Sequence, residues 1–151
     1  MRAAGPPVSR PDLTGAVAEA VLVSGHLLRR PVRGFSMAPW IQDGDRMVLA
    51  PAAPSEIRPG DIVQFAAPDG LRVHRVLAAE PGRDGPRFFV AGDASEVPDG
   101  LVPAAAILGR VVAVTRDSRT IRLDVPAVRL RARLRAWRAR LGRRLRRRFH
   151  P

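Results

Sequence analysis

The chain contains 151 residues, enough for one domain of ordinary size and too few for two domains with separate cores. Hydrophobic residues make up 46% and charged residues 26%, a balance that is typical of folded proteins and argues against a wholly disordered chain. Cysteine and lysine are both absent, which excludes disulfides, thiolate metal sites, a cysteine nucleophile and catalysis by a side-chain amine.

The net charge of +12 at pH 7 belongs mainly to one end of the chain. Residues 126–151 contain 11 Arg and no acidic residue, whereas the rest of the chain contains 15 Arg and 14 acidic residues, a net charge of +1. A partner attracted by charge is therefore expected to meet this tail rather than the rest of the protein.

The N-terminal region is predicted to contain a flexible leader at 1–11, rich in Pro, and a helical segment at 12–31, in which the helix covers 12–30. Polar residues interrupt this helix, so it lacks the roughly 18 to 20 apolar residues of a membrane span. Arg29 and Arg30 stand where a signal peptide would need small residues for cleavage. We therefore expect neither a transmembrane span nor a signal peptide, and a location in the cytoplasm or at the periphery of a membrane.

Residues 32–125 are predicted to form a mainly β domain, because short apolar runs alternate there with Gly, Pro and Asp. The last two predicted strands flank a hairpin turn at 116–119 that contains Asp117 and Ser118. The predicted strands are 46–50, 61–66, 71–78, 87–91, 107–115 and 120–125.

The tail at 126–151 is predicted to form a basic amphipathic helix, because a stripe of apolar residues recurs every three or four positions and Arg fills the other faces. Its candidate contacts with a membrane or a polyanion are Leu130, Leu134, Trp137, Leu141, Leu145, Arg131 and Arg138. Three surroundings remain open for this helix: an anionic membrane surface, a nucleic acid, or solvent alone. Of the membrane and the nucleic acid, the nucleic acid is the less expected partner.

Four sequence boxes carry the candidate chemistry. The first, GFSMAPWIQDGDRMVL at 34–49, places Ser36 in a loop between Gly34 and Pro39, where a lone Ser is usually a turn residue. The others are RPGDIVQF at 58–65, VHRVL at 73–77 and FFVAGDASEVPD at 88–99. In this order, over residues 34 to about 112, they resemble the signal peptidase I and LexA-like superfamily of serine peptidases. The resemblance is closest to its branch in the endoplasmic reticulum, archaea and some Gram-positive bacteria.

This resemblance implies a coiled, mostly antiparallel β domain in which Ser36 attacks a peptide carbonyl. The superfamily pairs the serine with either Lys or His, and this chain contains no Lys. Arg75 cannot accept a proton near neutral pH, which leaves His74 as the candidate base in its box. An imidazole with an ordinary pKa of about 6.5 suits the removal of a serine proton at neutral pH.

The resemblance also implies the third catalytic residue, because the His-type branch carries an orienting Asp six residues after a Gly-Asp pair. Here the pair ends at Asp93 and the orienting residue is Asp99, which would hold the tautomer of His74. Asp93 itself is expected to cap its turn through backbone N–H groups and to support the site only indirectly. Asp45 and Asp61 are also expected to be turn residues.

Three further features of the first box bear on the site. The backbone N–H of Ser36 and its neighbours would meet the oxyanion. Many relatives have a second Ser at the position of Gly34, so this chain lacks one possible hydroxyl donor. Met37 either lines a substrate groove or belongs to the core.

The leading hypothesis is therefore a serine endopeptidase that cuts a leader or precursor peptide through Ser36, His74 and Asp99, with no metal or other cofactor. We expect residues 12–30 to be too short and too polar for the membrane anchor that signal peptidases usually carry there, and the C-terminal tail is a candidate substitute. One alternative is a LexA-like regulator that cleaves itself or binds nucleic acid. Against it, the 33 residues before Gly34 are too few for a helix-turn-helix domain. The other alternative is a catalytically silent peptide-binding module.

Overall fold

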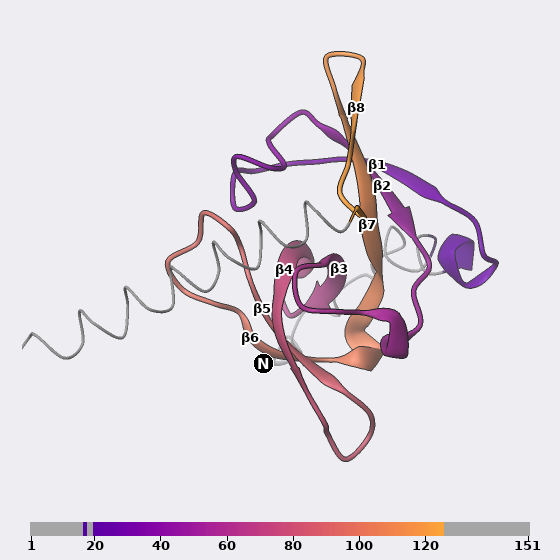
Figure 1. The fold of residues 1–151 in the computed structure, drawn as a ribbon, viewed down its shortest axis with the longest axis vertical. Helices are drawn as coiled ribbons and strands as arrows, with labels where there is room; N and C mark the ends of the chain where they lie inside the picture. The colour runs from indigo at the N-terminus through magenta and orange to yellow at the C-terminus, as the bar shows by residue number, and fades with distance from the viewer. Residues whose placement is uncertain (1–16, 18–19, 126–151) are drawn as a thin grey trace, which may run out of the picture.

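The computed structural model describes residue 17 and residues 20–125 (Figure 1). The leader expected at 1–11, most of the first half of the N-terminal helix and the whole tail at 126–151 lie outside these described residues. Within them, no helix has both the length and the apolar character needed to cross a membrane.

The described chain forms one antiparallel sheet, which confirms the prediction of a mainly β domain. Its strand order is β1-β2-β7-β3-β4-β5-β6, and β8 pairs with β7 outside this path. The strands are β1 Leu28–Pro31, β2 Arg46–Ala50, β3 Ile62–Ala67, β4 Gly70–Glu80, β5 Arg87–Ala91, β6 Gly100–Pro103, β7 Ile107–Arg116 and β8 Arg119–Arg122. Two short 3-10 turns, η1 Pro54–Glu56 and η2 Ala104–Ala106, complete the described elements.

The hairpin predicted at 116–119 joins β7 to β8, with Arg116 paired to Arg119. Asp117 and Ser118 have φ angles of 46° and 63°, the left-handed conformation that a tight two-residue hairpin turn requires at both central positions. Asp adopts this conformation at low cost, which explains the turn signal in the sequence.

The prediction of a helix reaching residue 30 is wrong. Helical residues end at Val23, and Gly25 follows with a φ of +83°, the left-handed conformation that commonly terminates helices. The chain then forms strand β1, whose Leu28 pairs with Leu49 of β2 and packs against the apolar core. The spacing of Leu28 from the neighbouring apolar residues fits a helix as well as a strand. The pairing with β2 selects the strand.

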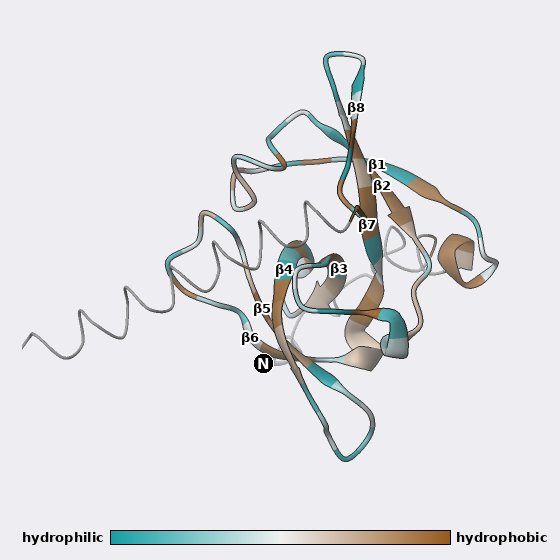
Figure 2. Cartoon of the chain, viewed as in Figure 1, coloured by the Kyte–Doolittle hydropathy of each residue, from teal (hydrophilic) through white to brown (hydrophobic). Residues whose placement is uncertain are grey.

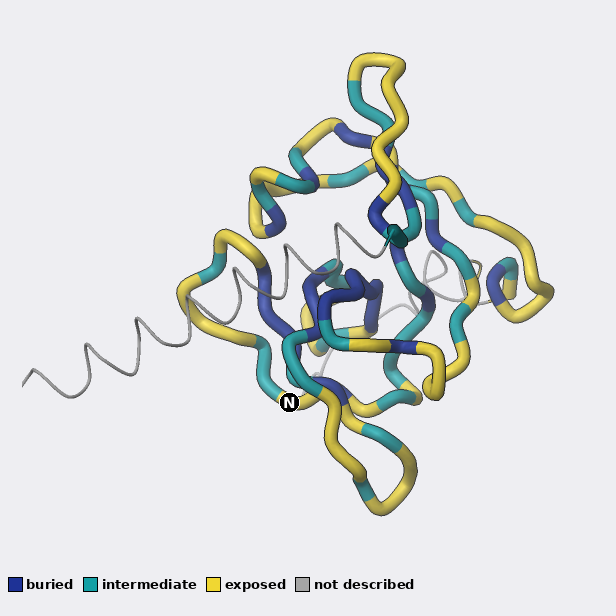
Figure 3. Tube along the Cα trace, in the orientation of Figure 1, coloured by how far each residue is buried: buried dark blue, intermediate teal, exposed yellow. Residues whose placement is uncertain are grey.

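Two apolar clusters lie on the two faces of the sheet's central strands. Successive side chains of β3 alternate between them, so that Ile62 joins the first cluster and Val63 the second. Figure 2 shows hydrophobic residues along the central strands, and Figure 3 shows exposed residues at the tips of the hairpins. The first cluster is Leu22, Met37, Ile41, Met47, Leu49, Ile62, Val111, Val114 and Leu123. The second is Ile57, Val63, Phe65, Val76, Phe88, Val90 and Val102.

Candidate active site

Ser36 is exposed in the loop after β1, and the residues around it fix its position. Gly34 has a φ of +89°, which an L-residue rarely adopts, and its N–H donates to Asp43 Oδ1 at 2.8 Å. On the other side, Met37 is 4% exposed and Ile41 is fully buried in the first apolar cluster. The buried side chains therefore anchor a loop whose serine hydroxyl faces outward.

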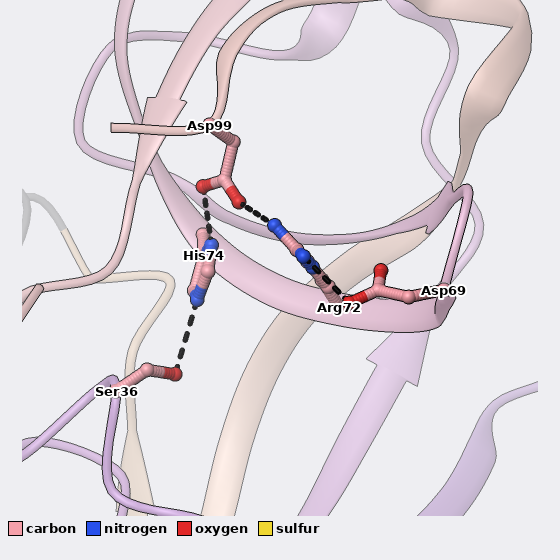
Figure 4. A network of polar contacts seen from close by, with 5 residues as sticks. All are labelled: Ser36, Asp69, Arg72, His74 and Asp99. Carbon is pink, nitrogen blue, oxygen red and sulfur yellow. Dashed lines mark hydrogen bonds and ion pairs between the residues drawn. The ribbon is translucent and has the colours of Figure 1, made fainter. Parts of the chain in front are cut away.

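His74 lies on β4 at the point where that strand changes partners. Its backbone pairs with Val63 of β3, whereas β5 begins to pair with β4 at Arg75. The imidazole is largely buried, and its ring centroid lies 6.1 Å from that of Phe65. His74 Nε2 lies 3.0 Å from Ser36 Oγ, within hydrogen-bond distance (Figure 4).

Asp99 completes a chain of polar contacts behind His74. Its backbone N–H donates to Val90 O at 3.1 Å, just before β6 begins, and its side chain is only 7% exposed. Asp99 Oδ2 lies 2.5 Å from His74 Nδ1. The structure thus brings together the three residues that the sequence indicated, from segments 38 and 25 residues apart.

The Arg72 guanidinium holds the other oxygen of Asp99. Arg72 Nη1 donates to Asp99 Oδ1 at 2.6 Å, and Arg72 Nη2 donates to Asp69 Oδ2 at 2.6 Å (Figure 4). The hydrogen bond that Arg72 donates to Asp69, and then the one it donates to Asp99, raise the pKa of Arg72, while the bond from Arg72 lowers the pKa of Asp69. Both oxygens of Asp99 therefore have a nitrogen partner, which restricts how the carboxylate can rotate.

Sequence reasoning did not predict Arg72 and Asp69 as part of the site. One signal was present, because Arg72 and His74 are two residues apart on a predicted strand and therefore share a face. Nothing local indicated that this face would meet Asp99, which lies 27 residues further along the chain.

Contrary to the prediction, Asp93 does not cap its turn. Its two carboxylate oxygens accept from Arg75 Nε at 2.8 Å and Arg75 Nη2 at 2.6 Å. The Arg75 side chain is 3% exposed, and its Nη1 also donates to Gly60 O at 2.8 Å. A buried guanidinium needs a counter-charge, so the role of Asp93 is to neutralise Arg75.

Gly92 allows the following loop to pack directly against the site. A Cβ on Gly92 would clash with Ser95 Oγ, lie 2.7 Å from Ser36 O and lie 3.1 Å from His74 Nε2. The N–H of Ala94 donates to Ser36 O at 2.8 Å. In this Gly-Asp pair, the close approach therefore requires the glycine, because any side chain at that position would meet the atoms of the site.

Asp45 and Asp61 have structural partners, in agreement with their prediction as turn residues. Asp45 is 2% exposed, accepts from the N–H of Gln42 at 2.8 Å and binds Arg116 through both oxygens. The hydrogen bond from Arg116 lowers the pKa of Asp45 even though burial opposes this shift. Asp61 accepts from the N–H of Arg58 at 2.9 Å and lies 3.7 Å from Arg110.

Ser36 and His74 open into a cleft of about 440 Å³. Residues 30–34 form one part of its lining and residues 71–74 another, while Met37 and Ile41 belong to both the cleft and the core. Met37 therefore both lines the cleft and belongs to the core, the two roles that the sequence left open for it. The remaining lining residues are Ser36, Met47, Gln64 and Ser95.

The described residues contain no cluster of three or more His, Cys, Asp or Glu side chains that could hold a metal ion. Within this part of the chain, the backbone N–H of Ser36 donates no hydrogen bond to a protein acceptor. Comparison with known proteins found no matching family model and no matching curated protein.

Proposed function

We propose that this protein is a serine endopeptidase of the signal-peptidase type, with Ser36 as nucleophile, His74 as general base and Asp99 as the residue that orients His74. The observation that carries the proposal is the unbroken contact chain from Ser36 Oγ through His74 to Asp99, with separations of 3.0 Å and 2.5 Å. A nucleophile next to a base, and a base next to an orienting carboxylate, is the arrangement that acyl transfer requires.

In the proposed reaction, Ser36 Oγ attacks the scissile carbonyl carbon while His74 Nε2 takes the hydroxyl proton. Asp99 stabilises the imidazolium through Nδ1–H, and the backbone N–H of Ser36 is a donor for the oxyanion. His74 then gives its proton to the leaving amine, which departs as the acyl-enzyme forms. A water molecule deprotonated by His74 attacks the ester, and the second product leaves as Ser36 regains its proton.

The cleft also suits an extended peptide. Strand β1 is at one end of the sheet order, and its pairing partner β2 occupies one of its edges. The first half of β4 pairs with β3 before the contacts with β5 begin at Arg75. Each segment therefore has a backbone edge that the described strands leave unpaired beside the cleft, and a peptide strand can hydrogen-bond to such an edge.

The proposal also covers the fold family of the β domain and the place of the protein at a membrane surface. The four ordered sequence boxes together with the antiparallel β domain support a signal-peptidase-like or LexA-like architecture. For the tail at 126–151, we propose a role in holding the enzyme at an anionic membrane surface, on the strength of its Leu and Arg pattern.

A fluorophosphonate, which reacts covalently with activated serines, tests the site directly. Wild-type protein should be labelled at Ser36, as located by peptide mass spectrometry, and His74→Ala should react far more slowly. Ser55→Ala, which removes an exposed hydroxyl in η1, is the matched control and should label like wild type. Folded protein that shows no labelling at Ser36 would favour the silent peptide-binding alternative.

A further inference from the structure

Among the residues that the structure describes, those lining the cleft that leads to Ser36 and His74 carry positive charge and no negative charge. Its lining includes Arg30, Arg33 and Arg72 but no Asp or Glu. Outside the tail, by contrast, Arg and acidic residues are nearly balanced at 15 and 14. The charge of the cleft is therefore a local feature of the surface rather than a consequence of the basic tail.

Two of these three arginines have no acidic partner among the described residues. Arg72 is paired with both Asp69 and Asp99. Among the described residues, Arg30 and Arg33 form no ion pair, and the hydrogen bond of Arg30 goes to the neutral Gln64 Oε1 at 3.4 Å. Gln64 is 3% exposed, so this contact holds the guanidinium against the cleft without neutralising it.

Arg30 and Arg33 lie along the path that a substrate bound at Ser36 would follow. Arg33 precedes Ser36 by three residues and Arg30 precedes it by six, along one wall of the cleft. An extended peptide advances about 3.3 Å per residue, so a substrate bound at Ser36 passes both guanidinium groups within about six residues of its scissile bond. Guanidinium groups bind carboxylates in a planar, two-pronged geometry.

We propose that this cleft selects peptides that carry Asp or Glu within about six residues of the scissile bond, through Arg30 and Arg33. The proposal rests on the proposed peptidase function and defines its substrate class. Each guanidinium remains partly in contact with water, so one acidic residue should raise kcat/KM by about two- to fivefold. This preference should weaken as ionic strength rises, because salt screens partly exposed charges.

The same charges disfavour the protein's own tail as a substrate. Residues 126–151 carry 11 Arg and no acidic residue, so the cleft should repel them. The intact mass of the purified protein should therefore stay unchanged during incubations in which added peptides are cleaved.

The test uses a peptide library made by digesting a denatured proteome, with every new cut site located by mass spectrometry. Wild-type protein should show enrichment of Asp and Glu near its cut sites. Arg30→Glu/Arg33→Glu should lose this enrichment or reverse it toward Arg and Lys. The matched control is Arg29→Glu/Arg46→Glu, which makes the same change in charge at exposed positions of β1 and β2 outside the cleft lining. It should keep the wild-type preference.

The outcomes separate this proposal from the peptidase function. Cleavage that depends on Ser36 but shows no acidic enrichment would overturn the substrate class and leave the peptidase function standing. If no cleavage depends on Ser36, the peptidase function fails, and binding to Ser36→Ala decides the remaining question. Fluorescent decapeptide pools of Ala with Glu, Gln or Lys would then be compared by anisotropy. Equal binding of the three pools would contradict a cleft that selects acidic peptides.

Discussion

Two polar pairs formed by neighbouring residues of β4 differ in a way that separates chemistry from structure. His74 contacts Asp99 and Arg75 contacts Asp93, and the two aspartates lie six residues apart in one loop. Arg75 is a permanent cation, bound by Asp93 and by Gly60 O, with a side chain only 3% exposed. His74 can lose its proton and has Ser36 Oγ at its other nitrogen. Only the His74 pair can therefore transfer protons, while the Arg75 pair holds the loop in place.

The largest effect should come from breaking the His74 pair. Ser36→Ala and His74→Ala should each abolish peptide cleavage, because the nucleophile or its base is removed. Asp99→Asn should leave weak activity, with kcat reduced by about 10⁴-fold, since the amide favours the wrong tautomer of His74. Single-turnover kinetics on a cleavable peptide checks this order. Full activity in His74→Ala would place the base elsewhere.

Breaking the Arg75 pair should mainly change stability. Asp93→Asn leaves a buried guanidinium without its counter-charge, which should lower the free energy of unfolding by about 3 kcal/mol. Urea unfolding followed by tryptophan fluorescence measures this change. His74→Ala should cost clearly less in the same assay. An Asp93→Asn variant that unfolds like wild type but is inactive would instead indicate a direct role for Asp93 in the reaction.

The third prediction concerns the charges around the His74 pair. Activity should fall at acidic pH, because the general base must be neutral imidazole. Arg72→Gln removes a cation that competes for Asp99, so the acid limb of kcat/KM should move to higher pH. Asp69→Asn leaves Arg72 less neutralised and should move that limb to lower pH.

The opposite signs of these two shifts are the decisive readout. A role for Arg72 that is only structural would change kcat/KM without moving the acid limb in opposite directions. Arg87→Gln and Glu80→Gln provide a matched control, because they break another exposed pair, at 2.6 Å on β4 and β5. Neither control variant should move the limb.

A smaller effect is expected on acid stability, through Asp45. Its pKa is lowered in the folded state, mainly by Arg116, so its ionised form stabilises the fold above the ordinary value of 3.8. That stabilisation should disappear as the pH falls from about 3.8 toward the lower folded-state pKa. Thermal unfolding from pH 7 to 2.5 should show a flatter pH dependence for Asp45→Asn than for wild type.

The smallest effect on both pairs should come from removing the tail. Truncation after Pro126 should leave stability and the cleavage of short peptides unchanged, while it abolishes co-sedimentation with anionic vesicles. Neutral vesicles should bind weakly with or without the tail. Binding to duplex DNA with a steep salt dependence, combined with indifference to anionic vesicles, would assign the tail to nucleic acid instead.

Local sequence patterns were sufficient for much of the fold. The strands Arg46–Ala50 and Arg87–Ala91 agree with the predicted ranges, because each apolar run is bounded by Gly, Pro or Asp. Strand β6 was missed, since Gly100–Pro103 is short and begins and ends with residues that usually signal turns. It forms because β5 offers an antiparallel partner, with Val102 opposite Phe88.

The sequence alone determined which side chains are available for chemistry: it contains no Lys or Cys, and the resemblance of its ordered boxes to a peptidase family implied Ser36, His74 and Asp99 as the candidates. Their catalytic roles remain predictions. Only the tertiary structure decided that Arg72 binds Asp99, that Asp93 neutralises Arg75, and that arginines without an acidic partner in the described part of the chain line the cleft. These contacts join segments 18 or more residues apart, and they depend on strand register and loop paths. Neither is encoded in any short stretch of sequence, because each arises from how distant strands pack to bury their apolar faces.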